Sequence, residues 1–221
     1  LDVEVLIHGI DVEAVAAQKV HRSAVRDELR IADDEVVIGI VANFRKEKAY
    51  DLLLDAAAKV TATNPKVRFV SVGQGPLEAE VRAQHRQLDL GDRFLILGYR
   101  NDATRVMSAF DVFTLTSHHE GLPVSLMEAL ALDLPVIATA VGGIPTALEG
   151  WPSIVVAAGS TTTLVDAFSA IDDLVGTANP TQSHTRFDVA ASVERLRQLY
   201  LGSRSPAADE LRHDHHQGAR R

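Results

Sequence analysis

Short hydrophobic runs alternate with helix-like segments along the middle of the chain. Six runs rich in Val, Ile, Leu and Phe are predicted as strands, at residues 36–42, 67–72, 94–97, 112–116, 135–139 and 153–156. The first run, VVIGIVA, is continuously apolar, which is typical of a strand buried on both faces of a sheet. We therefore expect a central sheet with both faces covered.

Segments with apolar residues at helical spacing lie between these runs. Helices are predicted at residues 50–60, 77–88, 103–110 and 124–132, and along the stripe Leu164, Phe168, Ile171 and Val175. Strands that alternate with helices predict an α/β fold, a doubly wound parallel (Rossmann-like) sheet of about six strands. Ligands of such sheets bind outside the carboxyl ends of the strands, so the loops at that edge are the first place to look for a site.

The two ends of the chain differ from this alternating region. We expect a linker and a surface helix at residues 1–33, a main domain at 34–178, a C-terminal amphipathic helix at 179–202 and a polar, disordered tail at 203–221. A short apolar strand is predicted at residues 3–7. Because the chain begins with Leu1 rather than Met, we expect it to be the C-terminal part of a longer protein.

Composition and charge narrow the function classes. The chain is 46% hydrophobic and 24% charged, as globular proteins are, and its net charge of −8 argues against nucleic acid as a partner. Without cysteine it has neither disulfides nor a cysteine-ligated zinc site. No apolar run approaches the roughly 20 residues of a membrane span, and no signal peptide is recognised, so we expect a cytoplasmic protein.

One charged side chain, Glu128, interrupts the apolar segment 124–132. A carboxylate on a buried helix needs donors, which ligand hydroxyls or a neighbouring backbone N–H could supply. Glu120 lies in a Glu-Gly-Leu-Pro turn that should cap the same helix, with Pro123 in its first turn. Free N–H groups and the positive helix end favour anions there. The pattern indicates a ligand with hydroxyls and phosphates; two purely structural glutamates are the alternative.

Both glutamates belong to a longer pattern, S-x-x-E-G-L-P-x-x-x-x-E-A-x-A-x-x-x-P-V-I-A-T-x-x-G-G, which begins at Ser117. This pattern resembles the signature of glycosyltransferase family 4, retaining enzymes of the GT-B fold with a Glu-x7-Glu motif. The resemblance covers residues 5–201 and implies the C-terminal, donor-binding half, at 34–178. It further implies that Glu120 contacts the donor sugar, that Glu128 holds the ribose hydroxyls, and that the N–H groups of Gly121 and Leu122 assist at the diphosphate.

A basic loop, Asn43-Phe44-Arg45-Lys46-Glu47-Lys48, follows the first strand. Fixed cations there would stabilise the charge on a leaving diphosphate. The resembled family usually has Gly-Arg…Lys-Gly at this place. Lys48 matches the Lys, whereas Asn43 stands for the Arg and Ala49 for the second Gly, so Arg45 is expected to supply the guanidinium. The alternative is a solvated basic loop without a role in binding.

Three further loops fall at the same edge of the sheet. Gly73 and Gly75 form a turn that is favoured as structural, with backbone contact to a ligand as an additional role. Gly142-Gly143 is expected either to let the backbone come close to a ligand or simply to provide positive φ. The resemblance places the Tyr99-Arg100 loop near a nucleobase, mainly through its backbone.

The resemblance predicts an enzyme that transfers a sugar, with retention, from a nucleotide diphosphate sugar. It implies no cofactor and no metal, in agreement with the lack of an Asp-x-Asp motif. The partners would be the nucleotide-sugar donor, an unidentified acceptor and a missing N-terminal acceptor domain. Any peripheral association with a membrane would occur only through that missing domain. Without that domain we expect the chain to be inactive.

Two alternatives stay open. One is another enzyme on a similar sheet, such as a nucleotide-sugar epimerase or an NAD-dependent dehydrogenase, although the glycine-free first turn speaks against the dehydrogenase. The other is a non-catalytic nucleotide- or sugar-binding module. Three departures from the pattern of the resembled family favour it: Asn43, Ala49, and Thr146, which stands where the family commonly has the Glu of Gly-Gly-x-x-Glu.

Overall fold

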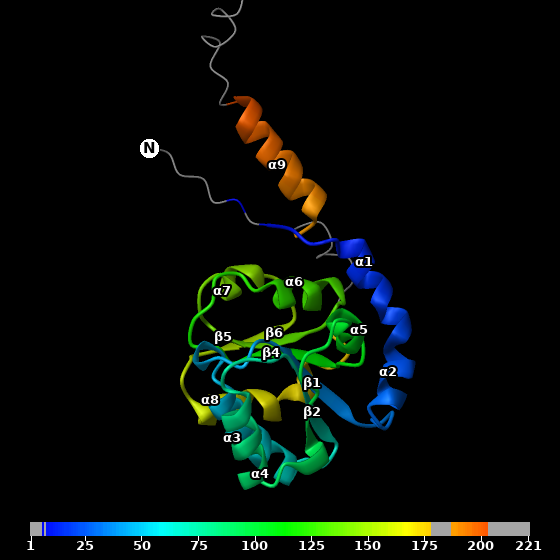
Figure 1. Cartoon of the computed structure of the whole chain (residues 1–221), viewed down its shortest axis with the longest axis vertical. Coiled ribbons are helices and arrows are strands. Elements are labelled where there is room, and N and C mark those ends of the chain that lie inside the picture. Colours follow the sequence, from blue (N-terminus) through cyan, green and yellow to red (C-terminus); the bar gives the residue numbers. More distant parts are fainter. Residues whose placement is uncertain (1–5, 7, 178–186, 203–221) are drawn as a thin grey trace, which may run out of the picture.

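The computed structural model of the chain describes residues 6, 8–177 and 187–202 (Figure 1). Its centre is one sheet of six strands: β1 (Val36–Val41), β2 (Val67–Val72), β3 (Phe94–Ile96), β4 (Val112–Leu115), β5 (Val136–Thr139) and β6 (Ser153–Val156). Neighbouring strands are parallel throughout, in the order β3-β2-β1-β4-β5-β6. The predicted Rossmann-like parallel sheet is confirmed.

The strand order places a crevice at the middle of the sheet. From β1 the chain adds β2 and β3 on one side, and then crosses over to add β4, β5 and β6 on the other. The connections on the two sides of the β1–β4 boundary therefore leave in opposite directions, which opens a crevice at the carboxyl ends of these strands. The loops after β1, β2, β3 and β4 all reach this edge.

Helices cover both faces of the sheet (Figure 1). One face carries α3 (Tyr50–Thr63), α4 (Glu78–Gln87) and α8 (Thr161–Ser169), and the other carries α5 (Ala103–Met107), α6 (Val124–Ala131) and α7 (Ile144–Ala147). The strands are buried accordingly, with β4 and β5 buried at every position. Gly39 in β1 makes room for Phe110, because a Cβ at Gly39 would lie 2.0 Å from the phenyl ring.

The N-terminal region is more broken than the predicted single surface helix. It consists of α1 (Val12–Ala16), the 3₁₀ segment η1 (Ala17–His21) and α2 (Arg22–Glu28). Arg26 is 4% exposed, and its guanidinium donates to the carbonyls of Ala32 and Glu35 and to Asp111 Oδ2. These contacts attach α2 to the sheet, so this helix is only partly a surface element.

The C-terminal helix α9 (Val189–Gly202) extends away from the body of the molecule (Figure 1). Its start is joined to the chain near Ile10, whose N–H donates to Phe187 O at 2.8 Å. The predicted apolar stripe stays uncovered: Val193, Leu196 and Tyr200 are 58%, 42% and 72% exposed. No described helix combines the length and the apolar character that crossing a membrane requires.

Two predicted helices are too long. The helix over the stripe that begins at Leu164 ends at Ser169, and a 3₁₀ turn, η4 (Ile171–Asp173), follows it, which leaves Val175 exposed. The predicted helix 103–110 ends at Met107, because tighter i→i+3 bonds lead the chain to Phe110 under β1. The predicted strand at residues 3–7, apart from residue 6, and the predicted tail at 203–221 lie outside the described residues.

Candidate functional site

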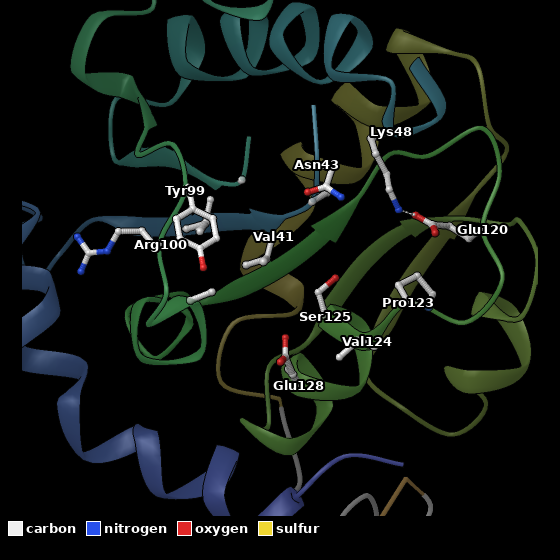
Figure 2. Close-up of a pocket in the computed structure, with 14 residues that line it drawn as sticks. Val41, Asn43, Lys48, Tyr99, Arg100, Glu120, Pro123, Val124, Ser125 and Glu128 are labelled. Carbon is white, nitrogen blue, oxygen red and sulfur yellow. Dashed lines mark hydrogen bonds and ion pairs between the residues drawn. The ribbon is translucent and has the colours of Figure 1, made fainter. Parts of the chain in front are cut away.

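A pocket of about 370 Å³ opens at the carboxyl ends of β1 and β2, beside α6 (Figure 2). Five predicted site residues line it: Asn43, Lys48, Gly73, Glu120 and Glu128. The remaining lining residues are Val41, Ala42, Val72, Tyr99, Arg100, Ala103, Pro123, Val124 and Ser125. The structure thus brings together parts of the chain that are up to 87 positions apart, as counted from Val41 to Glu128.

Glu128 projects from α6 into this pocket (Figure 2). It is half-buried, and this burial raises the pKa of its carboxyl above the ordinary value. Among the residues that the structure describes, none forms a hydrogen bond or an ion pair with the Glu128 side chain. The structural alternative considered for this glutamate, a bond to a neighbouring backbone N–H, is therefore not found in the described part of the chain.

Unlike Glu128, Glu120 has hydrogen-bond donors within the protein. Its side chain is 8% exposed and its Oε1 accepts two short hydrogen bonds, one from Lys48 Nζ at 2.5 Å and one from Ser117 Oγ at 2.6 Å. Figure 2 shows the ion pair across one end of the pocket. A cation and a neutral donor, both from the protein, hold this carboxylate in place.

Contacts between two loops fix the position of Lys48. Lys48 ends the 3₁₀ turn η2 (Lys46–Lys48), and Thr116 Oγ1 at the end of β4 donates to its carbonyl at 3.0 Å. The N–H of His118 donates to Glu47 O at 2.7 Å. The next residue, Ala49, is 1% exposed and has left-handed backbone angles, φ 49° and ψ 47°. Glycine adopts this conformation without strain, which explains why the resembled family usually has glycine here.

Close backbone approach accounts for the glycine loops. A Cβ at Gly73 would lie 2.0 Å from Ala42 O, and one at Gly142 would lie 1.9 Å from Glu120 O. The N–H of Gly143 donates to Gly121 O at 2.7 Å. Gly142 also has positive φ, 55°, which was one of the two expectations for this loop. The Gly142-Gly143 loop thus supports the turn that carries Glu120.

Four predicted site residues, Arg45, Gly75, Gly121 and Leu122, do not line the pocket. Arg45 is exposed at the start of η2. Gly75 packs against the backbone of Phe44, where a Cβ would lie 2.5 Å from Phe44 O. Gly121 and Leu122 were expected to face the pocket at the start of α6. The residues that line it there are Pro123 and, in the first turn of the helix, Val124 and Ser125.

Pro123 caps α6 rather than lying in its first turn. The helix begins at Val124, and the carbonyl of Pro123 accepts from the N–H of Leu126 at 3.1 Å. The N–H groups of Val124 and Ser125, which come before Leu126 in the first turn, have no acceptor within their own helix. With the helix dipole, they give the pocket a partial positive charge at this end.

The Tyr99-Arg100 loop reaches the rim of the pocket, but the Arg100 guanidinium points away from it (Figure 2). It forms two bonds with Asp102, at 2.7 and 2.8 Å, and one with Glu28 at 2.9 Å. These bonds raise the pKa of Arg100 and lower the pKa of Asp102 below its usual range. Tyr99 is 67% exposed. No group of three potential metal ligands occurs among the residues described.

Fold and pocket define a doubly wound α/β protein with a pocket at the carboxyl ends of its strands, which two glutamates and a lysine line together with apolar residues. Residues 21–173, more than half of the chain, match the model of the family described as glycosyl transferases group 1. The chain belongs to this family.

Two curated relatives each match more than half of the chain. EpsF of Bacillus subtilis, an inferred glycosyltransferase, is 37% identical over 135 residues, which are 61% of this chain and 35% of EpsF. The N-acetyl-alpha-D-glucosaminyl L-malate synthase of Bacillus anthracis is 31% identical over 124 residues, 56% of this chain and 32% of the synthase. The chain therefore spans about a third of the length of these relatives.

Solved structures share the fold. HepE of Anabaena, in complex with UDP and glucose, superposes with a TM-score of 0.79 at 24% identity, over 90% of this chain and 56% of HepE. The C-terminal domain of LpcC, a glycosyl transferase group 1 family protein of Francisella tularensis, gives a TM-score of 0.70 at 20% identity, over 82% of this chain and 100% of that domain.

Proposed function

We propose that the pocket binds a nucleotide diphosphate sugar and that the chain is the donor-binding half of a retaining, family 4 glycosyltransferase. The observation that carries the proposal is Glu128, a half-buried carboxylate that faces a pocket of about 370 Å³ and has no protein donor in the described part of the chain. A carboxylate in such a place gains most from ligand groups that donate hydrogen bonds, and vicinal ribose hydroxyls are such groups. HepE, which shares the fold, was solved with UDP and with glucose.

The charges along the pocket suggest the orientation of the donor. Lys48 and the start of α6 offer positive charge where a diphosphate would lie between Glu128 and Glu120. The nucleoside would then lie on the Glu128 side, where the exposed ring of Tyr99 offers a surface for a base. The sugar would lie on the Glu120 side.

This arrangement supplies the electrostatic part of a group transfer. As the bond between sugar and diphosphate breaks, negative charge grows on the leaving diphosphate, and Lys48 and the helix end are already in position to stabilise it. Neither group requires a metal ion for this role. The acceptor must come from outside the described site. Bringing the reactants together contributes roughly 7–11 kcal/mol to such reactions, so we expect the isolated chain to bind donors without useful transfer.

A binding panel tests the proposal. The chain is titrated calorimetrically with UDP-, GDP- and ADP-glucose and with NAD. We expect saturable binding of at least one nucleotide sugar in preference to NAD, and no measurable sugar transfer to added acceptors. Preference for NAD would favour a dehydrogenase-type site instead. Turnover by the 221-residue chain would show that the acceptor site lies within it.

A further inference from the structure

Glu120 receives both of its hydrogen bonds on one carboxylate oxygen. Lys48 Nζ and Ser117 Oγ both donate to Oε1, at 2.5 and 2.6 Å. No described residue donates to Oε2 of this carboxylate. Two donors on one oxygen fix the plane and direction of the carboxylate and leave the second oxygen for a ligand.

The two donors respond differently to a bound diphosphate. Lys48 is a charged, four-carbon side chain, and its side chain is 20% exposed at the pocket. A diphosphate has more negative charge than one carboxylate, so it draws the ammonium group away from Glu120 or shares it. The Ser117 hydroxyl is neutral and gains nothing comparable from the diphosphate.

Ser117 is also the more rigidly held donor. Its side chain is completely buried, and its carbonyl accepts from Thr139 Oγ1 on β5 at 2.6 Å. The adjacent N–H of His118 is bound to Glu47 O in η2. A serine side chain has a single heavy-atom torsion, so its oxygen stays where this fixed backbone places it.

On this basis we propose that Ser117 is a positioning residue. It keeps Glu120 directed at the donor sugar when Lys48 turns toward the diphosphate. The inference rests on the proposed function and adds different roles for the two donors. Lys48 exchanges between the Glu120 carboxylate and the diphosphate, whereas Ser117 stays hydrogen-bonded to the carboxylate throughout. Ser117 itself touches no substrate in this scheme.

The proposal predicts a loss confined to the sugar part of the ligand. For any nucleotide, the sugar increment is the ratio of the dissociation constants of the free diphosphate and its sugar conjugate. UDP, GDP and ADP are each titrated beside their glucose conjugates, and UDP also beside UDP-N-acetylglucosamine. In Ser117→Ala we expect the increment to fall about tenfold, because Glu120 loses its fixed donor, while affinity for the free diphosphate changes less than twofold.

Ser108 provides a matched control. It is 6% exposed, and its Oγ donates to Arg105 O at 2.6 Å, a bond as short as that of Ser117 but remote from the pocket. Ser108→Ala should lower the melting temperature about as much as Ser117→Ala and leave the sugar increment unchanged. Ser117→Cys, which keeps the size but donates weakly, should give an intermediate increment and replaces the Ala variant if that variant does not fold.

The outcomes separate the inference from the function on which it rests. If the wild-type chain binds none of the conjugates, both are overturned. If it binds them with a sugar increment that Ser117→Ala or Ser117→Cys leaves unchanged, the positioning role is wrong and the proposed function stands. Equal losses for free diphosphate and conjugate would show that Ser117 acts on the whole loop and would also overturn the positioning role.

Discussion

The two ends of the pocket solve the problem of a buried carboxylate in opposite ways. At one end, Lys48 and Ser117 both donate hydrogen bonds to Glu120. At the other, Glu128 faces the pocket with a raised pKa and no donor among the described residues. The protein itself positions a partnered carboxylate, whereas a buried carboxylate without a donor costs stability and gains from a ligand that donates to it. If the pocket binds a nucleotide sugar as proposed, we expect the Glu120 end to determine geometry and the Glu128 end to contribute affinity.

The largest expected effect is on nucleotide affinity in Glu128→Ala and Glu128→Gln. Charge-assisted hydrogen bonds contribute roughly 1.5–3 kcal/mol each, so losing those to the ribose should weaken binding by tenfold or more. Calorimetry with the preferred nucleotide measures this loss. Both variants should fold, because neither alanine nor glutamine disturbs a helix. Unchanged affinity would remove the main support for the proposed function.

The same substitution should have the opposite effect on stability. The raised pKa of Glu128 means that the folded state binds its proton more tightly than the unfolded state does, so ionisation costs stability as the pH rises through the folded pKa. Glu128→Gln should therefore be more stable than the wild type at pH 8. The difference should shrink toward pH 4, where both states of the wild type approach protonation. Urea melts at several pH values measure it.

Glu120→Gln is the matched comparison for that stability effect. Here the substitution removes the acceptor of an ion pair whose partners are 8% and 20% exposed. We expect this variant to be less stable than the wild type at pH 8, opposite in sign to Glu128→Gln. Equal signs for the two variants would break the contrast between the two ends of the pocket.

A smaller, selective loss is expected for Lys48→Ala. Affinity for a nucleoside diphosphate should fall about tenfold, since one fixed charge at the diphosphate is removed, and affinity for the nucleoside alone should change little. Lys46→Ala is the control, because Lys46 is in the same 3₁₀ turn but is exposed and does not line the pocket. A similar loss for nucleoside and diphosphate would indicate that Lys48 acts through the fold of the loop.

How far the sequence predicts this molecule differs between fold and site. The strands are well predicted, and those at Val67–Val72 and Ser153–Val156 match to the residue. Continuous burial leaves a strong hydrophobic signal. The helix predicted along Leu164 to Val175 is too long, because Ile171 stays buried through a turn at Ala170 that keeps an apolar residue at helical spacing.

Site residues depend on contacts between distant segments, and sequence spacing does not contain these contacts. The motif indicated Glu120 and Glu128, but not that Ser117 and Lys48 share one oxygen of Glu120. Gly142 could be recognised as a glycine with a role, but its closeness to Glu120 O appears only in three dimensions. The sequence offered one signal for Ser117, which is its place as the first residue of the motif.

Arg45→Ala should weaken diphosphate binding even less than Lys48→Ala does. Arg45 is exposed at the start of η2 and does not line the pocket, so we expect diphosphate affinity to change by less than about threefold. The same titration that measures Lys48→Ala decides it. A tenfold loss would instead mean that the loop closes on the ligand and that Arg45 replaces the arginine that is absent at Asn43.

The smallest expected effect is on the stability of Ala49→Gly. The Lys48 end of the pocket contains backbone strain as well as an ion pair, because Ala49 has φ 49° and ψ 47° in a 1% exposed position. A left-handed conformation costs a non-glycine residue roughly 1–2 kcal/mol, and the greater freedom of glycine in the unfolded chain cancels about 0.5–1 kcal/mol of that cost.

Ala49→Gly should therefore stabilise the chain by about 0.5–1 kcal/mol, measured as a higher urea midpoint with an unchanged denaturant slope. Ala49→Val, whose branched side chain tolerates positive φ poorly, should be destabilised and serves as the control. Diphosphate affinity should be the same in Ala49→Gly and the wild type, because the hydrogen bonds from Thr116 and His118 hold η2 independently of the strain. A loss of affinity together with the gain in stability would show that the strain itself presents Lys48 to the ligand, and the geometry of this end would then depend on residue 49 as well as on Ser117.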